Sequence, residues 1–208
     1  MVPVGDYYLF SDYSATLNLG GFANITKLTN PIIAYDICPV NTVLNFLSGK
    51  LKLSYDDRGK MASEGKIINK MFNELNLIKF YDFSPPKSLG IEWVKEEIDP
   101  ILTKYEKFPV KDLLHTFVIH IALKISSQFP SEGKILVTGG GVYNEFLINQ
   151  IKKKSKCELI KPSSDLIEFK EALIFGFLGV LKLRNEINCF SSVTGAKKDH
   201  SSGVIYNI

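Results

Sequence analysis

The stretch KILVTGGGVYNEFLINQIKKKSKCELI, residues 134–160, decides the fold class of this chain. Its first five residues form a compact apolar run that is typical of a buried strand. Three glycines follow, and a helical pattern begins near Asn144. The segment Cys157–Ile160 predicts a second strand, and apolar residues from Leu166 to about Leu183 predict a long helix. Strand, helix, strand and helix in this order are typical of parallel strands joined by crossovers, so the stretch predicts an α/β fold.

The first forty residues make the predicted sheet a mixed one. Ala15–Leu19 and Ala23–Leu28 are strand candidates joined by a two-glycine turn. Glycine tolerates the positive φ that a tight hairpin demands, so these strands are expected to be antiparallel. Pro31–Tyr35 predicts a third short strand that ends at Asp36. Helical spacing of apolar residues follows at 43–47, 67–77 and 110–129.

Composition excludes several classes of protein. The 208 residues are 45% hydrophobic and 23% charged, which is ordinary for a globular chain and excludes intrinsic disorder. The formal net charge is only +3, so there is no general electrostatic case for binding nucleic acid or a membrane surface. No apolar run approaches the roughly 18 residues that a bilayer-spanning helix needs.

The cysteines indicate a reducing compartment. Cys38, Cys157 and Cys189 lie far apart and form no C-x-x-C pair, which excludes a zinc knuckle and a dithiol redox motif. We therefore expect reduced thiols in a cytoplasmic protein, and no residue is predicted to be a metal ligand. Pro3 and Gly5 predict a loop at the start of the chain.

Two glycine-rich elements are candidates for phosphate binding. Gly139, Gly140 and Gly141 stand between a strand and a helix, where free backbone N–H groups and the positive helix end favour an anion. Gly20 and Gly21 form a hairpin tip that phosphates could approach closely. Each element also has a simpler interpretation, as a tight turn or an ordinary hairpin, and neither matches a dinucleotide fingerprint or a P-loop. A nucleotide in a cleft between two subdomains would meet both elements.

Several carboxylates and histidines have two interpretations each. Asp36 at a strand end is either a catalytic or metal-linked acid, or a capping residue of the following turn. Glu168 and Glu171 share one face near the start of an apolar helix, where they either complement the helix dipole or face a polar ligand. His115 and His120 lie in an apolar helix and are expected to be structural or exposed to solvent.

Seven segments carry a resemblance to a known family. They are LNLGGFANIT (17–26), DICPVN (36–41), YDDRGKMASEG (55–65), PPKSLG (85–90), TGGGVYN (138–144), EALIF (171–175) and SVTGA (192–196). Each is weak singly, but together and in this order they resemble the motifs of the anhydro-N-acetylmuramic acid kinase family. That family belongs to the actin-like, ribonuclease-H-like superfamily of sugar kinases, so the resemblance implies a ribonuclease-H-like (actin-like ATPase) lobe with a mixed sheet flanked by helices.

The resemblance also implies an activity. The family uses ATP and Mg²⁺ on 1,6-anhydro-N-acetylmuramic acid, opening the anhydro ring with water while phosphorylating the 6-hydroxyl to give N-acetylmuramic acid 6-phosphate. The implied partners are this amino sugar, ATP and a second copy of the chain in a homodimer. The implied site residues are Gly20 and Gly21 at the phosphates; Gly139, Gly140, Gly141 and Asn144 on the adenosine side; Glu171, Glu168, Asn24 and Lys87 at the sugar; and Asp36 as the catalytic candidate.

The chain departs from the family pattern in two respects. Ile37, Cys38 and Val40 stand where the family's D-T-G-P-G-N has a threonine and two glycines, whereas Asp36 and Asn41 remain. The family's N-terminal lobe, with a phosphate loop and the aspartate that is the general base, would precede residue 1. We therefore expect residues 1–208 to be the C-terminal lobe of a sugar kinase, inactive alone. The alternatives are a non-catalytic nucleotide-binding or interaction module, and a kinase of another sugar.

Overall fold

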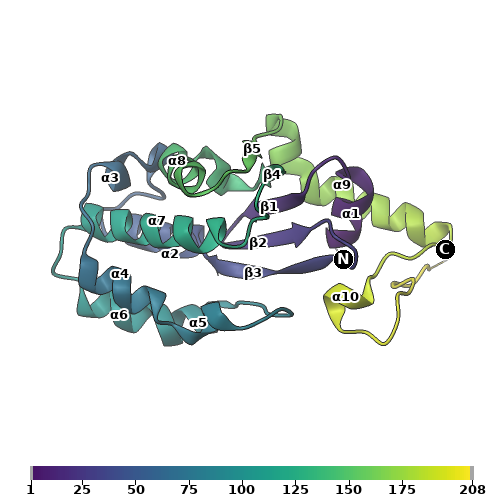
Figure 1. The fold of residues 1–208 in the computed structure, drawn as a ribbon, viewed down its shortest axis with the longest axis horizontal. Helices are drawn as coiled ribbons and strands as arrows, with labels where there is room; N and C mark the ends of the chain where they lie inside the picture. The colour runs from purple at the N-terminus through teal and green to yellow at the C-terminus, as the bar shows by residue number, and fades with distance from the viewer. Residues whose placement is uncertain (1, 207–208) are drawn as a thin grey trace.

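A mixed five-stranded sheet forms the centre of the structure, a computed structural model that describes residues 2–206 (Figure 1). Its strand order is β3-β2-β1-β4-β5. The first three strands form an antiparallel meander, and β4 and β5 run parallel to β1. This is the ribonuclease-H-like arrangement that the resemblance implied. The strands are β1 (Ala15–Leu19), β2 (Phe22–Lys27), β3 (Ile33–Pro39), β4 (Lys134–Thr138) and β5 (Glu158–Ile160).

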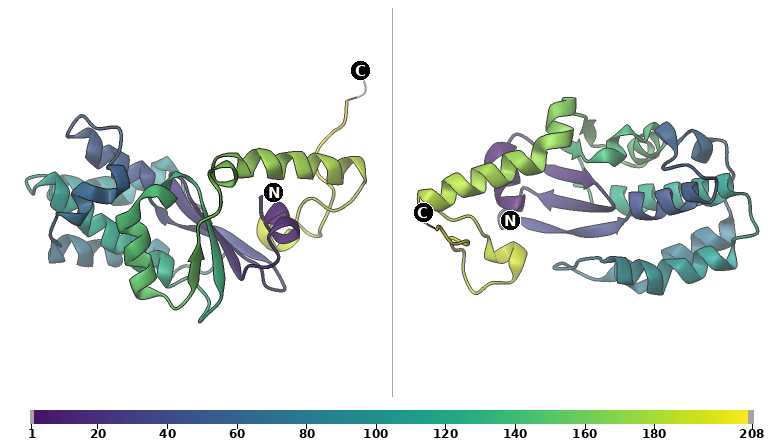
Figure 2. Two further views of the ribbon diagram at one scale, coloured as in Figure 1. Left: turned by 90° about the horizontal axis from the view of Figure 1, so that it is seen from above. Right: turned by 180° about the vertical axis from the view of Figure 1, so that it is seen from behind.

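Helices cover both faces of the sheet. Figure 2 shows α1, α9 and α10 on one side, with α2, α7 and α8 on the other. Among residues 2–206, no helix is both long and apolar enough to cross a membrane. The helices are α1 (Val2–Leu9), α2 (Asn41–Gly49), α3 (Lys60–Ser63), α4 (Asn69–Asn76), α5 (Ile91–Trp93), α6 (Asp99–Lys104), α7 (Val110–Ser126), α8 (Glu145–Lys154), α9 (Ser164–Leu183) and α10 (Ser191–Thr194).

The alternation of side chains along the strands divides the core into two clusters. Leu17 and Val137 belong to the large cluster shared with α2, α7 and α8, and both are buried. Leu136, the neighbour of Val137, points to the opposite face and packs with Ile174 of α9. Successive residues of a strand face opposite sides, so the central strands β1 and β4 must be apolar on both faces wherever helices cover both.

The first residues of the chain contradict the predicted loop. Val2–Leu9 is a helix, because proline is tolerated in a first helical turn and Gly5 serves packing instead of a turn. A Cβ atom at Gly5 would lie 2.6 Å from side-chain atoms of Ile174, so the glycine allows α1 to approach α9 closely.

A buried ion pair fastens α1 to the sheet and to α9. Asp6 Oδ1 lies 2.8 Å from Lys170 Nζ, and both side chains are almost fully buried. The hydroxyls of Thr16 and Thr26 each donate a hydrogen bond of 2.8 Å to Asp6 Oδ2. One carboxylate thus joins four elements, and its desolvation is offset by three partners.

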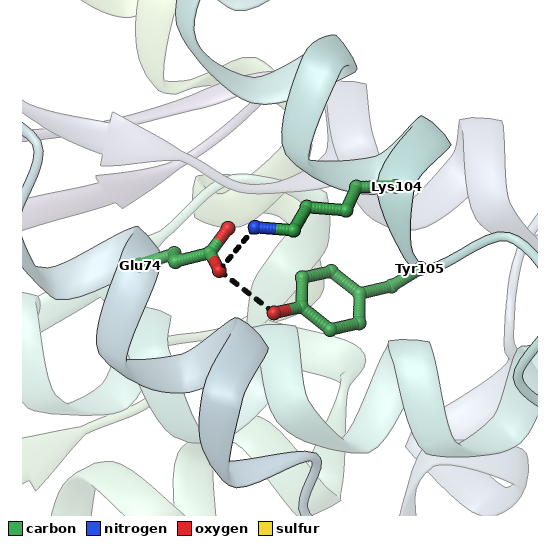
Figure 3. Close-up of polar contacts among 3 residues, drawn as sticks. All are labelled: Glu74, Lys104 and Tyr105. Carbon is green, nitrogen blue, oxygen red and sulfur yellow. Dashed lines mark hydrogen bonds and ion pairs between the residues drawn. The ribbon is translucent and has the colours of Figure 1, made fainter.

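A second polar cluster joins α4 to the end of α6 (Figure 3). Glu74 Oε1 accepts hydrogen bonds from Lys104 Nζ at 2.6 Å and from the Tyr105 hydroxyl at 2.8 Å. These bonds to the charged carboxylate hold the pKa of Glu74 below its usual value.

Candidate functional site

The two glycine elements of the sequence pack against each other. Gly139 has a φ of +80°, and a Cβ atom there would lie 2.8 Å from the carbonyl of Leu19 at the end of β1. A Cβ atom at Gly141 would lie 2.9 Å from the same Leu19 oxygen. Side chains at Gly139 and Gly141 would therefore separate the loop after β4 from the β1–β2 hairpin, and only glycine permits the observed contact.

The hairpin tip also holds the start of α2. The carbonyl of Gly21 accepts hydrogen bonds from the backbone N–H groups of Val40 at 2.8 Å and Thr42 at 3.2 Å, and the carbonyl of Gly20 accepts one from Asn41 at 3.3 Å. The tip carbonyls thus satisfy the first N–H groups of the helix, which have no partner within it. Gly20 and Gly21 are accordingly positioned as a support for α2 and the cleft beside it.

A cleft of about 550 Å³, here called the first cleft, lies beside the glycine loop. Of the predicted nucleotide residues, Gly140, Gly141 and Asn144 line it, whereas Gly20, Gly21 and Gly139 are not among its lining residues. Asn144 also caps α8, because its Oδ1 accepts a hydrogen bond of 3.0 Å from the N–H of Leu147.

Residues 55–58 also line the first cleft. Asp56 is buried, and its two carboxylate oxygens accept the N–H groups of Met61 and Ala62 at 2.9 Å each. Gly59 has a φ of +71°, and a Cβ atom there would lie 2.2 Å from Asn144 Oδ1. Asp56 therefore lines the cleft while its carboxylate holds the following turn, and Gly59 lies behind the lining against Asn144.

Charged and aromatic side chains also line the first cleft. Arg58 and Glu145 form an exposed ion pair at 3.6 Å. Lys161 Nζ lies 4.4 Å from the ring centroid of Tyr143, and Tyr55 contributes a further, mostly exposed ring. No sequence motif pointed to Lys161, because its place depends on β5 pairing beside β4.

A second cleft of about 530 Å³ brings together Asn24, Asp36 and Lys87. Asp36 was predicted at a strand end, but β3 continues to Pro39 because the following residues, Ile37 and Cys38, are buried in the core. Asn24 and Asp36 are partners across β2 and β3, beside a register shift. Three predicted residues from separate segments therefore line one cavity.

The two charged groups of the second cleft have shifted pKa values. Burial raises the pKa of Asp36, and the hydrogen bond that its Oδ2 accepts from the N–H of Leu89 at 2.8 Å partly opposes this. Burial lowers the pKa of Lys87, whose Nζ lies 3.2 Å from the carbonyl oxygen of Phe80 and 4.7 Å from its ring centroid. A half-buried acid and amine can exchange hydrogen bonds with hydroxyl groups of a polar ligand.

Glu168 and Glu171 lie apart from this group. Both are exposed on α9, and neither is among the lining residues of the first or second cleft. The spacing of three residues correctly places them on neighbouring positions of one helix, but it carries no information on which way that helix packs.

The departures from the family pattern within motif 36–41 lie in the hydrophobic core and not in the clefts. Ile37, Cys38 and Val40 are buried, and Cys38 and Val40 have no exposed surface. The retained Asp36 and Asn41 line the second and first cleft respectively. Burial also raises the pKa of the Cys38 thiol, which is therefore an inert core group.

Both helical histidines have structural contacts, as expected. His120 is fully buried, with its Nδ1 3.1 Å from Asn76 Oδ1 and its Nε2 3.0 Å from the Tyr81 hydroxyl. Burial lowers the pKa of His120 to about 3. His115 Nδ1 lies 2.8 Å from the carbonyl oxygen of Ala62.

Comparison with known proteins supplies the family. A family model described as anhydro-N-acetylmuramic acid kinase matches residues 1–208. Proteins named anhydro-N-acetylmuramic acid kinase are 32% identical over 216 residues in Francisella tularensis subsp. novicida, 30% over 226 in Coxiella burnetii (strain RSA 493 / Nine Mile phase I) and 28% over 220 in Bacillus cereus (strain AH187). The matches cover 95%, 99% and 95% of this chain, but only 57%, 59% and 58% of those relatives.

Among solved structures, the activator of the 2-hydroxyisocaproyl-CoA dehydratase from Clostridium difficile with bound ADPNP superposes with a TM-score of 0.47 at 16% identity. That superposition covers 83% of this chain and 61% of the activator.

Proposed function

Because this chain belongs to the anhydro-N-acetylmuramic acid kinase family, we propose that it forms part of an ATP-dependent kinase of 1,6-anhydro-N-acetylmuramic acid. The kinase opens the anhydro ring with water and phosphorylates the 6-hydroxyl, which yields N-acetylmuramic acid 6-phosphate. The observation that carries the proposal is the contact of Gly139 and Gly141 with Leu19, which sets the glycine loop beside the first cleft.

The first cleft is the proposed nucleotide site. Phosphoryl transfer asks a protein mainly for positioning and charge neutralisation. Gly140 and Gly141 have no side chain, so the adenosine side of the nucleotide can approach the backbone of the loop without obstruction. Lys161 and Arg58 supply positive charge at the same cleft, although Asp56, Asp57 and Glu145 also line it and Glu145 pairs with Arg58. Gly20 and Gly21 are proposed to act at the phosphate end of the site, which they support through α2.

Magnesium belongs to this proposal as the ATP–Mg²⁺ complex. Within residues 2–206 no three histidine, cysteine, aspartate or glutamate side chains gather as a metal site. Mg²⁺ commonly takes most of its ligands from phosphate oxygens and water, so it is treated as part of the substrate.

The second cleft is the proposed sugar site. Asn24 and Asp36 offer amide and carboxylate groups that bind sugar hydroxyls, and Lys87 offers a cation for the lactyl carboxylate. Asp36 is the candidate catalytic residue of the chain, because in the proposed site its carboxylate contacts the sugar. Glu171 and Glu168 remain sugar candidates only if another part of the enzyme brings the sugar to α9.

The chain covers only part of the length of its relatives, which bears on the activity that it can have alone. It spans less than three fifths of the relatives quoted above. We therefore propose that residues 1–208 are a C-terminal lobe that contributes ligand contacts, works as a cytoplasmic homodimer and needs a further lobe for turnover. The alternative is a nucleotide-binding or interaction module without catalysis.

Isothermal titration of the chain with ATP–Mg²⁺ and with the anhydro-sugar tests this function. Binding of both, without phosphate transfer when they are mixed, is the expected result. Binding of ATP without the sugar would favour the module. Rapid phosphorylation by the chain alone would contradict its incompleteness, and light scattering measures whether it dimerises.

A further inference from the structure

Helix α9 carries apolar residues on two opposite sides. Its inner side packs on the sheet and on α1 through Ile174, Leu178 and Leu181. Its outer side is exposed, and Figure 2 shows α9 continuing past the sheet. The exposed residues of this side, here called the outer stripe, recur at helical spacing and carry no charge: Phe169, Ala172, Leu173, Gly176, Gly179, Val180 and Leu183. A helix that is apolar on all sides is normally buried on all sides, so the outer stripe indicates a partner.

Two glycines in the middle of the outer stripe are not required by the fold of the chain itself. No other part of residues 2–206 lies within 4 Å of a Cβ atom built at Gly176 or Gly179, in contrast to Gly5, where a Cβ atom would collide with Ile174. Glycine in an exposed helix costs roughly 1 kcal/mol of stability relative to alanine. Because glycine lets another backbone approach closely, the centre of the outer stripe favours contact with a second helix.

The outer stripe is complementary to itself when two copies of α9 run antiparallel. A two-fold axis beside Gly176 brings residues at equal distances before and after it to the same level of the helix pair. The residues that share a level are Phe169 with Leu183, Ala172 with Val180, and Leu173 with Gly179. The inner levels each combine a small residue with a larger one. The largest side chains meet at the two ends, where helices that cross at an angle diverge.

The charges beside the outer stripe are complementary in the same arrangement. Glu168 and Glu171 are exposed on the N-terminal half of α9. Lys182 follows Glu171 by about three helical turns, so it lies on the same flank of the C-terminal half. In the antiparallel pair, Lys182 of one copy comes level with the gap between the two glutamates of the other copy. Opposite charges at the rim of an interface help to fix its register.

We propose that two copies of this chain dimerise through the outer stripe of α9, antiparallel and with the two-fold axis beside Gly176. This rests on the homodimer of the proposed function and names its surface. The competing occupant of the stripe is the further lobe. The second copy is favoured because the stripe matches itself in both size and charge, as an interface between identical surfaces must. A single pair of helices buries little area, so a dissociation constant of about micromolar is expected.

Sedimentation equilibrium of the 208-residue chain over a range of concentrations measures this dimer. Leu173→Glu brings a charge from each copy into the stripe and should weaken the dimer by about tenfold or more. Leu77→Glu, at an exposed leucine beside the end of α4, is the matched control and should leave the dimer unchanged. A monomer at every concentration would overturn the proposal in favour of the further lobe. A dimer of unchanged affinity in Leu173→Glu would place the interface on another face.

Cross-linking with copper phenanthroline as oxidant tests the register. Gly176→Cys brings two thiols beside the axis, so a disulfide-linked dimer is expected. Phe169→Cys lies about 10 Å along the helix from the axis, so it should cross-link with Leu183→Cys in a mixture but not with itself. Gly49→Cys, at an exposed glycine of α2 that also has no atom within 4 Å of its Cβ position, controls for chance collisions. Gly176→Cys that cross-links no faster than Gly49→Cys would overturn the two-fold arrangement.

Calorimetry with ATP–Mg²⁺ and the anhydro-sugar separates the interface from the proposed function. The outer stripe lines neither the first nor the second cleft, so Leu173→Glu should bind both ligands as the parent chain does. A dimer that binds neither ligand would contradict the proposed function and leave the interface standing. A strictly monomeric chain that binds both would contradict the interface alone.

Discussion

Asn24 and Asp36 are cross-strand partners on β2 and β3, at the place where the register of the two strands shifts. On one side of the shift Ala23 pairs with Cys38, and on the other Asn24 pairs with Asp36, so Ile37 is the extra residue. A bulge of this kind re-aims the side chains that follow it. Asp36 consequently lines the second cleft beside Asn24, while Cys38 stays in the core.

Replacing Asp36 by asparagine should separate sugar binding from nucleotide binding. Asp36→Asn keeps an oxygen for the N–H of Leu89 but loses the charge and acceptor capacity that a sugar hydroxyl would meet. Affinity for the anhydro-sugar should fall by about tenfold or more, as is usual when a polar substrate group loses its partner, and ATP affinity should not change. Equal sugar affinities by calorimetry would place the sugar elsewhere.

Gly139→Ala should destabilise the chain, because both the φ of +80° and the nearby Leu19 carbonyl oppose a side chain. The expected loss in the free energy of unfolding is about 1–3 kcal/mol, the scale of one strained backbone residue. Gly140→Ala is the matched control, since its Cβ atom would come no closer than 3.9 Å to the side chain of Asn41. Urea unfolding measures both. Equal midpoints for the two variants would contradict the glycine contact.

Lys170→Met should lower the free energy of unfolding, because it leaves the buried Asp6 carboxylate without its cationic partner. The substitution leaves the Asp6 carboxylate buried with only two threonine hydroxyls, and removing one partner of a buried pair typically costs about 3–5 kcal/mol. Arg184→Met breaks an exposed pair with Glu186 and should cost less than about 1 kcal/mol. Adding Asp6→Asn to Lys170→Met should recover part of the loss, and a further drop in thermal stability would argue against the pairing.

His120 should make the chain sensitive to acid. Its pKa is about 3 in the folded state, against 6.5 as its ordinary value, so the unfolded chain binds the proton more readily. The stabilisation that the neutral ring contributes is complete above about pH 6.5 and is lost as the pH falls toward 3. Between these values the slope is about 1.4 kcal/mol per pH unit for one proton. Urea unfolding at several pH values should show a flatter slope in His120→Gln, and an unchanged slope would assign the acid sensitivity to other groups.

The fold followed from local patterns in most places. Short apolar runs bounded by turn or polar residues predicted all five strands, because a strand needs only period-two or continuous burial over a few residues. The errors came from tertiary context. Pro3 and Gly5 carry loop signals, yet the close packing of Gly5 on Ile174 favours a helix there. Likewise Asp36 interrupts an apolar run without ending the strand, since the bulge allows Asp36 to line the second cleft.

The candidate sites were predicted only where a motif and a topological position coincide. Gly140, Gly141 and Asn144 were identified from the turn after a strand and lie in a cleft. Lys161 was missed, because its position depends on how β5 pairs. Glu168 and Glu171 were placed on one helix face correctly, but the side of the sheet that α9 covers is decided by contacts such as Asp6 with Lys170, which no local pattern reports.

The pairing of β1 with β4 has a consequence for the order of folding. Ala15 pairs with Ile135, whereas β1, β2 and β3 pair with sequence neighbours. Pairing of distant segments requires closure of a long loop and is slow compared with hairpin formation. During synthesis the meander can assemble early, but the glycine loop cannot reach Leu19 until the chain has emerged past β4. The part of the first cleft that the glycine loop lines can therefore form only late in folding.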